Sequence, residues 1–307
     1  MIAWPAAALP ESAMNSPLTL IGLPIALGVI MLGMGLGLVV DDFRRVGRHP
    51  KAALVALLCQ LVLLPAICFG LVLAFGLAPE LAVGMMLLAA SPGGTTANIY
   101  SHLFGGNVAL NITLTAINSV LAVVTLPVVV NLSIGYFLTE GTSIGLQLDK
   151  VLQVFAIVLI PVAIGMLVRS RAPRVADRLQ RPVRILSIVV LVAVIAGAVY
   201  GERANIATYF VSVGLAVLAF NLLSLVIGYG VPRLAGVEPR AATAAGFEIG
   251  IHNSTLAITI ALSPALLNNS QMAIPAAVYG IVMFFTAAAF GWLVTRTHRR
   301  SEAEIRV

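Results

Sequence analysis

Residues 91–98 read SPGGTTAN and interrupt the middle of an otherwise apolar run, 81–103. Pro92 cannot donate a helical hydrogen bond, and the paired glycines that follow it loosen the backbone. A second apolar run, 241–262, is interrupted in the same way by GFEIGIHNST at 246–255. Inside a bilayer, backbone groups freed at such breaks persist only where they line a cavity or are buried in protein. Two broken helices in corresponding places of two halves predict the binding site of a secondary transporter.

The composition of the chain is that of a membrane protein. The chain has 307 residues, of which 60% are hydrophobic and 10% charged, and its mean hydropathy is +1.04. A soluble domain is about half apolar and about a quarter charged, so it could not bury this much apolar surface. The composition therefore argues against a soluble enzyme. Cys59 and Cys68 lie in one apolar run, where we expect them to be packing residues.

Nine runs are apolar enough to cross a bilayer as helices, each of which needs about 20 residues. They cover 18–40, 52–75, 81–103, 107–137, 149–168, 185–201, 206–231, 241–262 and 272–295. The predicted fold class is therefore an all-α polytopic membrane protein with about nine transmembrane helices. We divide it into an N-terminal segment (1–17), a first repeat of four spans (18–137), a second repeat of five spans (149–295) and a tail (296–307).

The basic residues predict the orientation of these spans. Sixteen of the 18 Lys and Arg residues fall in segments on one side of the predicted bilayer, and only Lys150 and Arg203 fall on the other. Since positively charged loops stay in the cytoplasm, we predict an extracytoplasmic N-terminus and a cytoplasmic C-terminus in a bacterial inner membrane. The net charge of +6 is then a topology signal and does not indicate a nucleic-acid partner.

Glu248 is the one acidic residue of twelve that lies within an apolar run. An ionisable group at that depth is unfavourable unless it meets a cation or a wet cavity, and the spans offer no Lys or Arg to pair with it. Carbonyls released at the breaks, together with this carboxylate, favour a small hard cation. The helix N-termini at the breaks favour an anion such as a carboxylate. The alternative is a Glu248 that is protonated or bonded to a neighbouring helix.

The chain resembles bacterial members of the bile acid:sodium symporter family from Gly28 to about residue 296. The motifs that carry the resemblance are GMGLGL (33–38), RHPKA (48–52), Gln60, SPGGTTAN (91–98), GGNVAL (105–110) and EIGIHNS (248–254). The resemblance implies an inverted-repeat transporter with two crossed discontinuous helices, a core domain and a smaller panel domain. Spans one, five and six would form the panel. It also implies sodium-coupled import of a small organic anion by alternating access, without a covalent step or an organic cofactor. The anion would be a 2-keto acid or a pantoate-like or bile-acid-like carboxylate.

The resemblance further implies up to two sodium ions behind the crossover of the broken helices. It assigns the first ion to Asn98, Asn111, Thr115 and Glu248. It assigns the second ion to Gln60, Glu248, the carbonyls of Ile249 and Ile251, and His252. It places the substrate carboxylate near Thr95, Thr96, Asn253 and Ser254.

Three positions depart from the pattern of the family. Asn111 stands where a hydroxyl is common, although its side chain can supply a carbonyl oxygen instead. Ala97 stands where relatives often have a serine hydroxyl, and His252 stands where they usually have Gln. A histidine offers nitrogen, which suits a hard ion less well than an amide oxygen does, and it titrates near physiological pH. A weakened second sodium site, or a proton in place of that ion, therefore stays open beside a neutral, hydrogen-bonded His252.

Other function classes receive less support. The sequence has no H-E-x-x-H or G-x-S-x-G motif, no phosphate loop and no second buried acid beside Glu248, so we expect no enzyme. A channel or a sensor remains possible. The closer alternative is a proton-coupled organic-anion transporter or an arsenite-type exporter of a related fold. Such exporters use a membrane cysteine near the broken helix, and neither Cys59 nor Cys68 lies in a break. The oligomeric state stays open.

Overall fold

The computed structural model describes residues 28–29, 31–33, 35–37, 47, 49–94, 96–138, 148–183, 185–186, 189, 206–263 and 266–304. Within these ranges the regular elements are helices, and the one β-bridge joins Gly93 to His252. Much of the predicted spans 18–40 and 185–201 lies outside the described residues, as do the N-terminal segment and Thr95.

Helices occupy the other seven predicted spans. They are α4 (Pro50–Leu58), the π-helix η2 (Cys59–Leu63), α5 (Leu64–Ala74), α6 (Pro79–Ala90), α7 (Thr96–Leu103), α8 (Val108–Phe137), α9 (Leu148–Arg171), α11 (Ile206–Leu234), α12 (Pro239–Gly250), α13 (Ser254–Leu262) and α14 (Ser270–Glu304). Four helical stretches among the described residues are long and apolar enough to cross a membrane: Pro50–Ala74, Val108–Phe137, Val213–Leu234 and Ser270–Arg296. The chain is thus a helical membrane protein, and the number of nine spans stays a prediction.

Two stretches of the chain build the same succession of elements. Gly76 follows α5 and Gly236 follows α11, both with positive φ, a backbone that glycine adopts without strain. A proline then stands in the first turn of the next helix, Pro79 in α6 and Pro239 in α12. Proline suits that turn because its missing N–H has no helical partner there. The local sequence therefore sets the start of both broken helices in the same way.

The second half of each stretch also matches. A break and a short helix follow, α7 in the first stretch and α13 in the second. Asparagine side chains then cap the long last helices: Asn107 accepts from Leu110 N in α8, and Asn269 accepts from Met272 N in α14. The last helix, α14, continues to Glu304, so it runs through most of the predicted tail 296–307.

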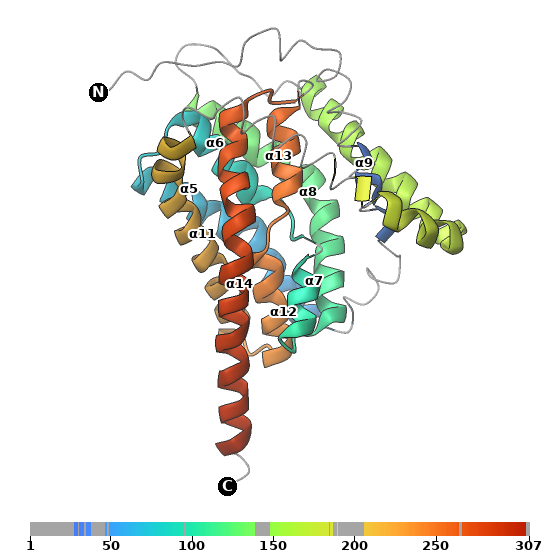
Figure 1. Ribbon diagram of the computed structural model, residues 1–307, viewed down its shortest axis with the longest axis vertical. Helices are drawn as coiled ribbons and strands as arrows, with labels where there is room; N and C mark the ends of the chain where they lie inside the picture. Colours follow the sequence, from blue (N-terminus) through green and yellow to red (C-terminus); the bar gives the residue numbers. More distant parts are fainter. Residues whose placement is uncertain are drawn as a thin grey trace.

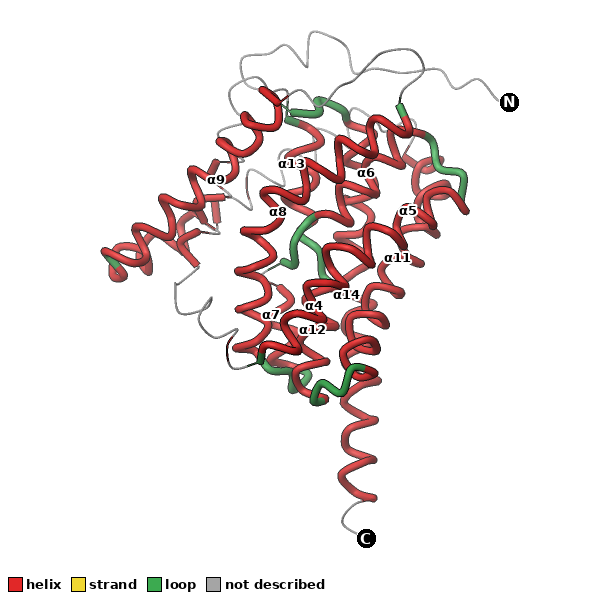
Figure 2. Tube along the Cα trace, turned by 180° about the vertical axis from the view of Figure 1, so that it is seen from behind, coloured by secondary structure: helices red, strands yellow, loops and turns green. Residues whose placement is uncertain are grey.

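The two broken helices run in opposite directions through the middle of the bundle. α6 and α13 lie together in the upper half of Figure 1, and α7 and α12 lie together in the lower half. Figure 2 shows the two breaks as loop segments at the centre. α8 packs on α6 and α12, α11 packs on α12, and α14 packs on α6 and α13. Residues 81–93 and 241–252 are all buried, whereas outer side chains such as Leu132 (67% exposed) present an apolar surface suited to lipid.

α9 lies to one side of this bundle (Figure 1). Arg169, near its end, donates to the Leu36 carbonyl at 2.6 Å, to Asp177 at 2.5 Å and to Gln180 at 3.2 Å. It thereby ties α9 to the helical residues 35–37 and 173–183. We call α9 with these two segments the side group. Two of its segments come from spans that the family resemblance assigns to the panel.

Candidate functional site

Backbone hydrogen bonds join the two breaks at the centre of the bundle. Gly94 N donates to Ile251 O at 2.8 Å, and Asn253 N donates to Pro92 O at 2.8 Å. In an unbroken helix the Asn253 amide would donate to the carbonyl of Ile249. Because that amide is used at the crossover instead, the Ile249 carbonyl loses its helical donor. The backbone groups that lose their helical partners at the breaks are thus enclosed by protein, which is required inside a bilayer.

The carbonyl of Ser91, at the end of α6, contacts two side chains. Gln60 Nε2 donates to it at 3.0 Å, and His252 Nδ1 lies 3.1 Å away. Since a carbonyl only accepts, Nδ1 carries a proton, and in the neutral ring Nε2 is then an acceptor. Gln60 Oε1 and His252 Nε2 are both buried without a hydrogen-bond partner among the described residues. The π-helix η2 positions Gln60, and such turns are frequent at functional sites.

Aromatic rings fix the orientation of His252. Its ring stacks on Phe220 with centroids 5.5 Å apart, and its edge contact with Tyr279 has centroids 5.3 Å apart. The ring is 1% exposed. The ring therefore has little freedom to turn.

Glu248 is fully buried on α12 and is held by side chains of α8. Thr115 Oγ1 donates to its Oε2 at 2.5 Å, and Asn118 Nδ2 donates to its Oε1 at 3.2 Å. A Cβ placed on Gly93 would overlap both carboxylate oxygens, so the first break lies directly against this group. No Lys or Arg among the described residues forms an ion pair with Glu248. An uncompensated carboxylate at this depth is unfavourable, so the site calls for a cation or a proton.

Two more buried oxygens lie on the helices around this carboxylate. Asn111, one turn before Thr115, donates its Nδ2 to Ala244 O at 2.7 Å, which leaves its Oδ1 free. Asn98 Oδ1, on α7, is also buried without a partner in the described part of the chain. Carboxylate, hydroxyl and amide oxygens are the ligands that hard cations prefer. The donor set therefore fits a sodium ion.

The predicted substrate residues have less uniform surroundings. Asn253 caps α13, its Oδ1 accepting from Leu256 N at 3.0 Å. Ser254 is buried against Gly280 of α14. Thr96 opens α7, and Thr95 lies outside the described residues.

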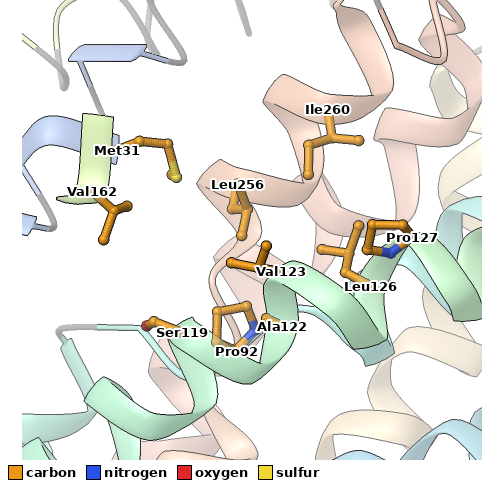
Figure 3. Close-up of a pocket in the computed structure, with 10 residues that line it drawn as sticks. All are labelled: Met31, Pro92, Ser119, Ala122, Val123, Leu126, Pro127, Val162, Leu256 and Ile260. Atoms are coloured by element: carbon orange, nitrogen blue, oxygen red, sulfur yellow. The ribbon is translucent and has the colours of Figure 1, made fainter. Parts of the chain in front are cut away.

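A narrow apolar pocket lies between the bundle and the side group (Figure 3). Its lining consists of Met31, Pro92, Ser119, Ala122, Val123, Leu126, Pro127, Val162, Leu256 and Ile260. Among the described lining residues Ser119 alone has a polar side chain, and its hydroxyl donates to the Thr115 carbonyl at 2.7 Å. The pocket has room for little more than a water molecule. Thr96, Asn253 and Ser254 are not among its lining residues.

Sequence reasoning missed two participants of this site. Ser91 acts through its backbone carbonyl, which no side-chain motif marks. Asn118 follows Asn111 by seven positions, and that spacing places both on one face of a helix. The pattern N-x-x-x-T-x-x-N over 111–118 was therefore an available signal.

Comparison with known proteins decides the family. The profile of the Sodium Bile acid symporter family matches residues 24–209. The chain belongs to this family. The resemblance inferred from the motifs is thereby confirmed.

Curated relatives of the family support the same conclusion. The chain is 29% identical over 259 residues to the uncharacterized sodium-dependent transporter YocS of Bacillus subtilis (strain 168), with 84% of this chain and 78% of the relative covered. It is 28% identical over 307 residues to the ileal sodium/bile acid cotransporter of Homo sapiens, with 96% and 86% covered. It is 25% identical over 265 residues to the probable sodium/metabolite cotransporter BASS2, chloroplastic, of Oryza sativa subsp. japonica, but it spans 62% of that protein. These relatives are transporters, so this family member is a membrane transporter and not an enzyme.

Proposed function

We propose that this protein is a sodium-coupled symporter that imports a small organic anion by alternating access across a bacterial inner membrane, with its C-terminus in the cytoplasm. The observation that carries the proposal is Glu248, a fully buried carboxylate without a basic partner among the described residues. Oxygens of Asn98, Asn111 and Asn118, buried without a partner in the described part of the chain, lie on α7 and α8, which both pack on α12. The names of the relatives, a sodium-dependent transporter and sodium cotransporters, support sodium as the coupling ion.

We propose up to two ions for these donors. The first sodium ion would bind Asn98, Asn111, Thr115 and Glu248. The second would bind Gln60, Glu248, the carbonyls of Ile249 and Ile251, and Nε2 of His252. Sodium would neutralise Glu248 and hold both breaks in the geometry that binds the anion. Because the coupling free energy is reciprocal, the anion raises sodium affinity by the factor by which sodium raises anion affinity.

The anion would meet the beginnings of α7 and α13, where unpaired helix N–H groups favour a carboxylate. Thr96, Asn253 and Ser254 stand at these two helix starts, and Thr95 precedes Thr96 in the sequence. Pro92 and Leu256, each within a few residues of one start, line the pocket. The body of the substrate would therefore extend from the crossover into the pocket.

The pocket lining supports a choice among substrate classes. The described residues that line it are apolar apart from Ser119, and none of them is Lys or Arg. A second carboxylate or several hydroxyls would lose their hydration there without gaining partners. The lining thus favours a 2-keto monocarboxylate with a hydrocarbon chain over a dicarboxylate or a pantoate-like acid.

Alternating access would use the boundary at which the pocket lies. Met31 and Val162 line it from the side of α9, and the other lining residues belong to the bundle. Because the pocket is too narrow for a carboxylic acid, a loaded state requires the side group to move relative to the bundle. Such hinge or shear motions are the usual repertoire of closure around ligands.

Uptake into proteoliposomes tests the proposal. The purified protein is reconstituted, and uptake of a labelled branched 2-keto acid is measured with an inward sodium gradient or with potassium in its place. We expect saturable uptake only with sodium. Uptake driven by a proton gradient alone would favour the proton-coupled alternative, and flux without saturation would favour a channel. Empty liposomes and the Glu248→Gln variant serve as controls.

A further inference from the structure

Asn118 lies on the face of α8 that is turned toward α12. Asn111, Thr115 and Asn118 stand at i, i+4 and i+7, which one side of a helix presents together. Asn111 bonds Ala244 O of α12, whereas Thr115 and Asn118 both bond the carboxylate of Glu248. Asn118 therefore belongs to the group of polar residues that surrounds Glu248.

Among the described residues, only the NH₂ group of the Asn118 side-chain amide makes a hydrogen bond. Its side chain is 2% exposed, and Nδ2 donates to Glu248 Oε1 at 3.2 Å. Since a carboxylate accepts and does not donate, the NH₂ group must face Glu248, and the carbonyl oxygen is the free atom. That Oδ1 is buried and has no partner among the described residues. A buried amide oxygen without a donor is unfavourable, and a cation next to the carboxylate would satisfy it.

Asn131 on the same helix shows the contrast. Its Nδ2 donates to Pro127 O at 2.9 Å within α8, and it is only partly buried. A polar residue of α8 can thus be accommodated without another helix. The different arrangement at Asn118 indicates a role toward Glu248 and its ion.

We propose that Asn118 is a further ligand of the first sodium ion, which it binds through Oδ1, and that its Nδ2 positions Glu248. The inference rests on the proposed sodium coupling. Asn118 would supply an oxygen to the first sodium site, where Ala97 has no hydroxyl. The next residue in α8, Ser119, lines the pocket.

Sodium binding to the purified full-length protein tests this role. Sodium affinity is measured by calorimetry, and the unfolding midpoint is compared in sodium and in potassium at equal ionic strength. Asn118→Leu is expected to weaken sodium affinity about ten- to hundredfold, the range for one hydrogen bond or ligand to a charged group. Asn131→Leu, the matched control about 20 Å away along the helix, is expected to keep wild-type sodium affinity.

If the inference holds, Asn118→Asp responds to sodium more strongly than wild type, whereas Asn118→Leu responds more weakly. It places two carboxylates next to each other, which repel without an ion and are both satisfied by one. In potassium, the unfolding midpoint of this variant should be lower than that of wild type. Adding sodium should raise the midpoint of the variant by more than it raises that of wild type.

The outcomes separate the inference from the proposed function. An Asn118→Leu protein that is destabilised equally in sodium and potassium, with unchanged sodium affinity, would show a merely structural role. If that variant does not fold, Asn118→Asp provides the test. A sodium-induced rise in its unfolding midpoint that is smaller than the rise in wild type overturns the inference. A wild-type protein that binds no sodium would instead overturn the proposed function itself.

Discussion

Replacing Gly93 with Ala perturbs the contact between the first break and the carboxylate of Glu248. A Cβ at this position would overlap Oε1 and Cδ of that side chain and would lie 2.7 Å from Oε2. Overpacking a buried site costs about 1–3 kcal/mol. If the carboxylate moves and loses one hydrogen bond from Thr115 or Asn118, a further loss of about 1.5–3 kcal/mol follows. The loss of that hydrogen bond alone corresponds to a loss of about ten- to hundredfold in sodium affinity.

The sodium affinity of purified Gly93→Ala protein is measured by calorimetric titration, and its stability is measured by thermal unfolding. Gly94→Ala is the matched control, because a Cβ there would have its nearest neighbours at 3.6 Å, an ordinary van der Waals distance. We expect the control to bind sodium nearly as well as wild type. Equal sodium affinities in Gly93→Ala and wild type would refute the placement of the ion at this carboxylate.

Three further substitutions probe other parts of the site. Ala122→Phe fills the apolar pocket, so anion binding should be lost while sodium binding without anion persists, as isothermal titration with each ligand will show. Tyr279→Phe removes the hydroxyl that donates to Gly250 O at 2.9 Å, and it should lower the free energy of unfolding by about 0.5–1.5 kcal/mol with little change in sodium affinity. His252→Gln supplies an amide oxygen in place of a titratable ring, so sodium affinity should rise and the pH profile of transport should flatten; an unchanged profile would remove His252 from the coupling.

Much of the core could be predicted from local sequence. A proline in the first turn and a glycine turn before it mark both broken helices, at Pro79 and Pro239. Glu248 stood out because a lone carboxylate within an apolar run needs a partner. The structure supplies hydrogen bonds to that carboxylate from α8, which supports the choice of Thr115 as its neighbour.

Other features depend on contacts that the sequence does not encode locally. The Ser91 carbonyl contacts Gln60 and His252 only because η2, the end of α6 and the break after α12 meet. The π-helix η2, which presents Gln60, has no marked sequence signal. The pocket forms between α8, α13 and the side group, whose packing no single-helix pattern predicts. Ser254, predicted to face the substrate, packs against Gly280 of α14. Its surroundings became known only with the arrangement of α13 and α14.

The most direct test of the account measures anion binding as a function of sodium. Binding of a labelled branched 2-keto acid to the purified protein is titrated at increasing sodium, with potassium keeping the ionic strength constant, for wild type and for Glu248→Gln. The account predicts that sodium tightens anion binding to wild type and has no such effect on the variant, in which the neutral amide cannot attract the ion. Anion binding to wild type that is the same with and without sodium would show that this protein does not couple the anion to sodium.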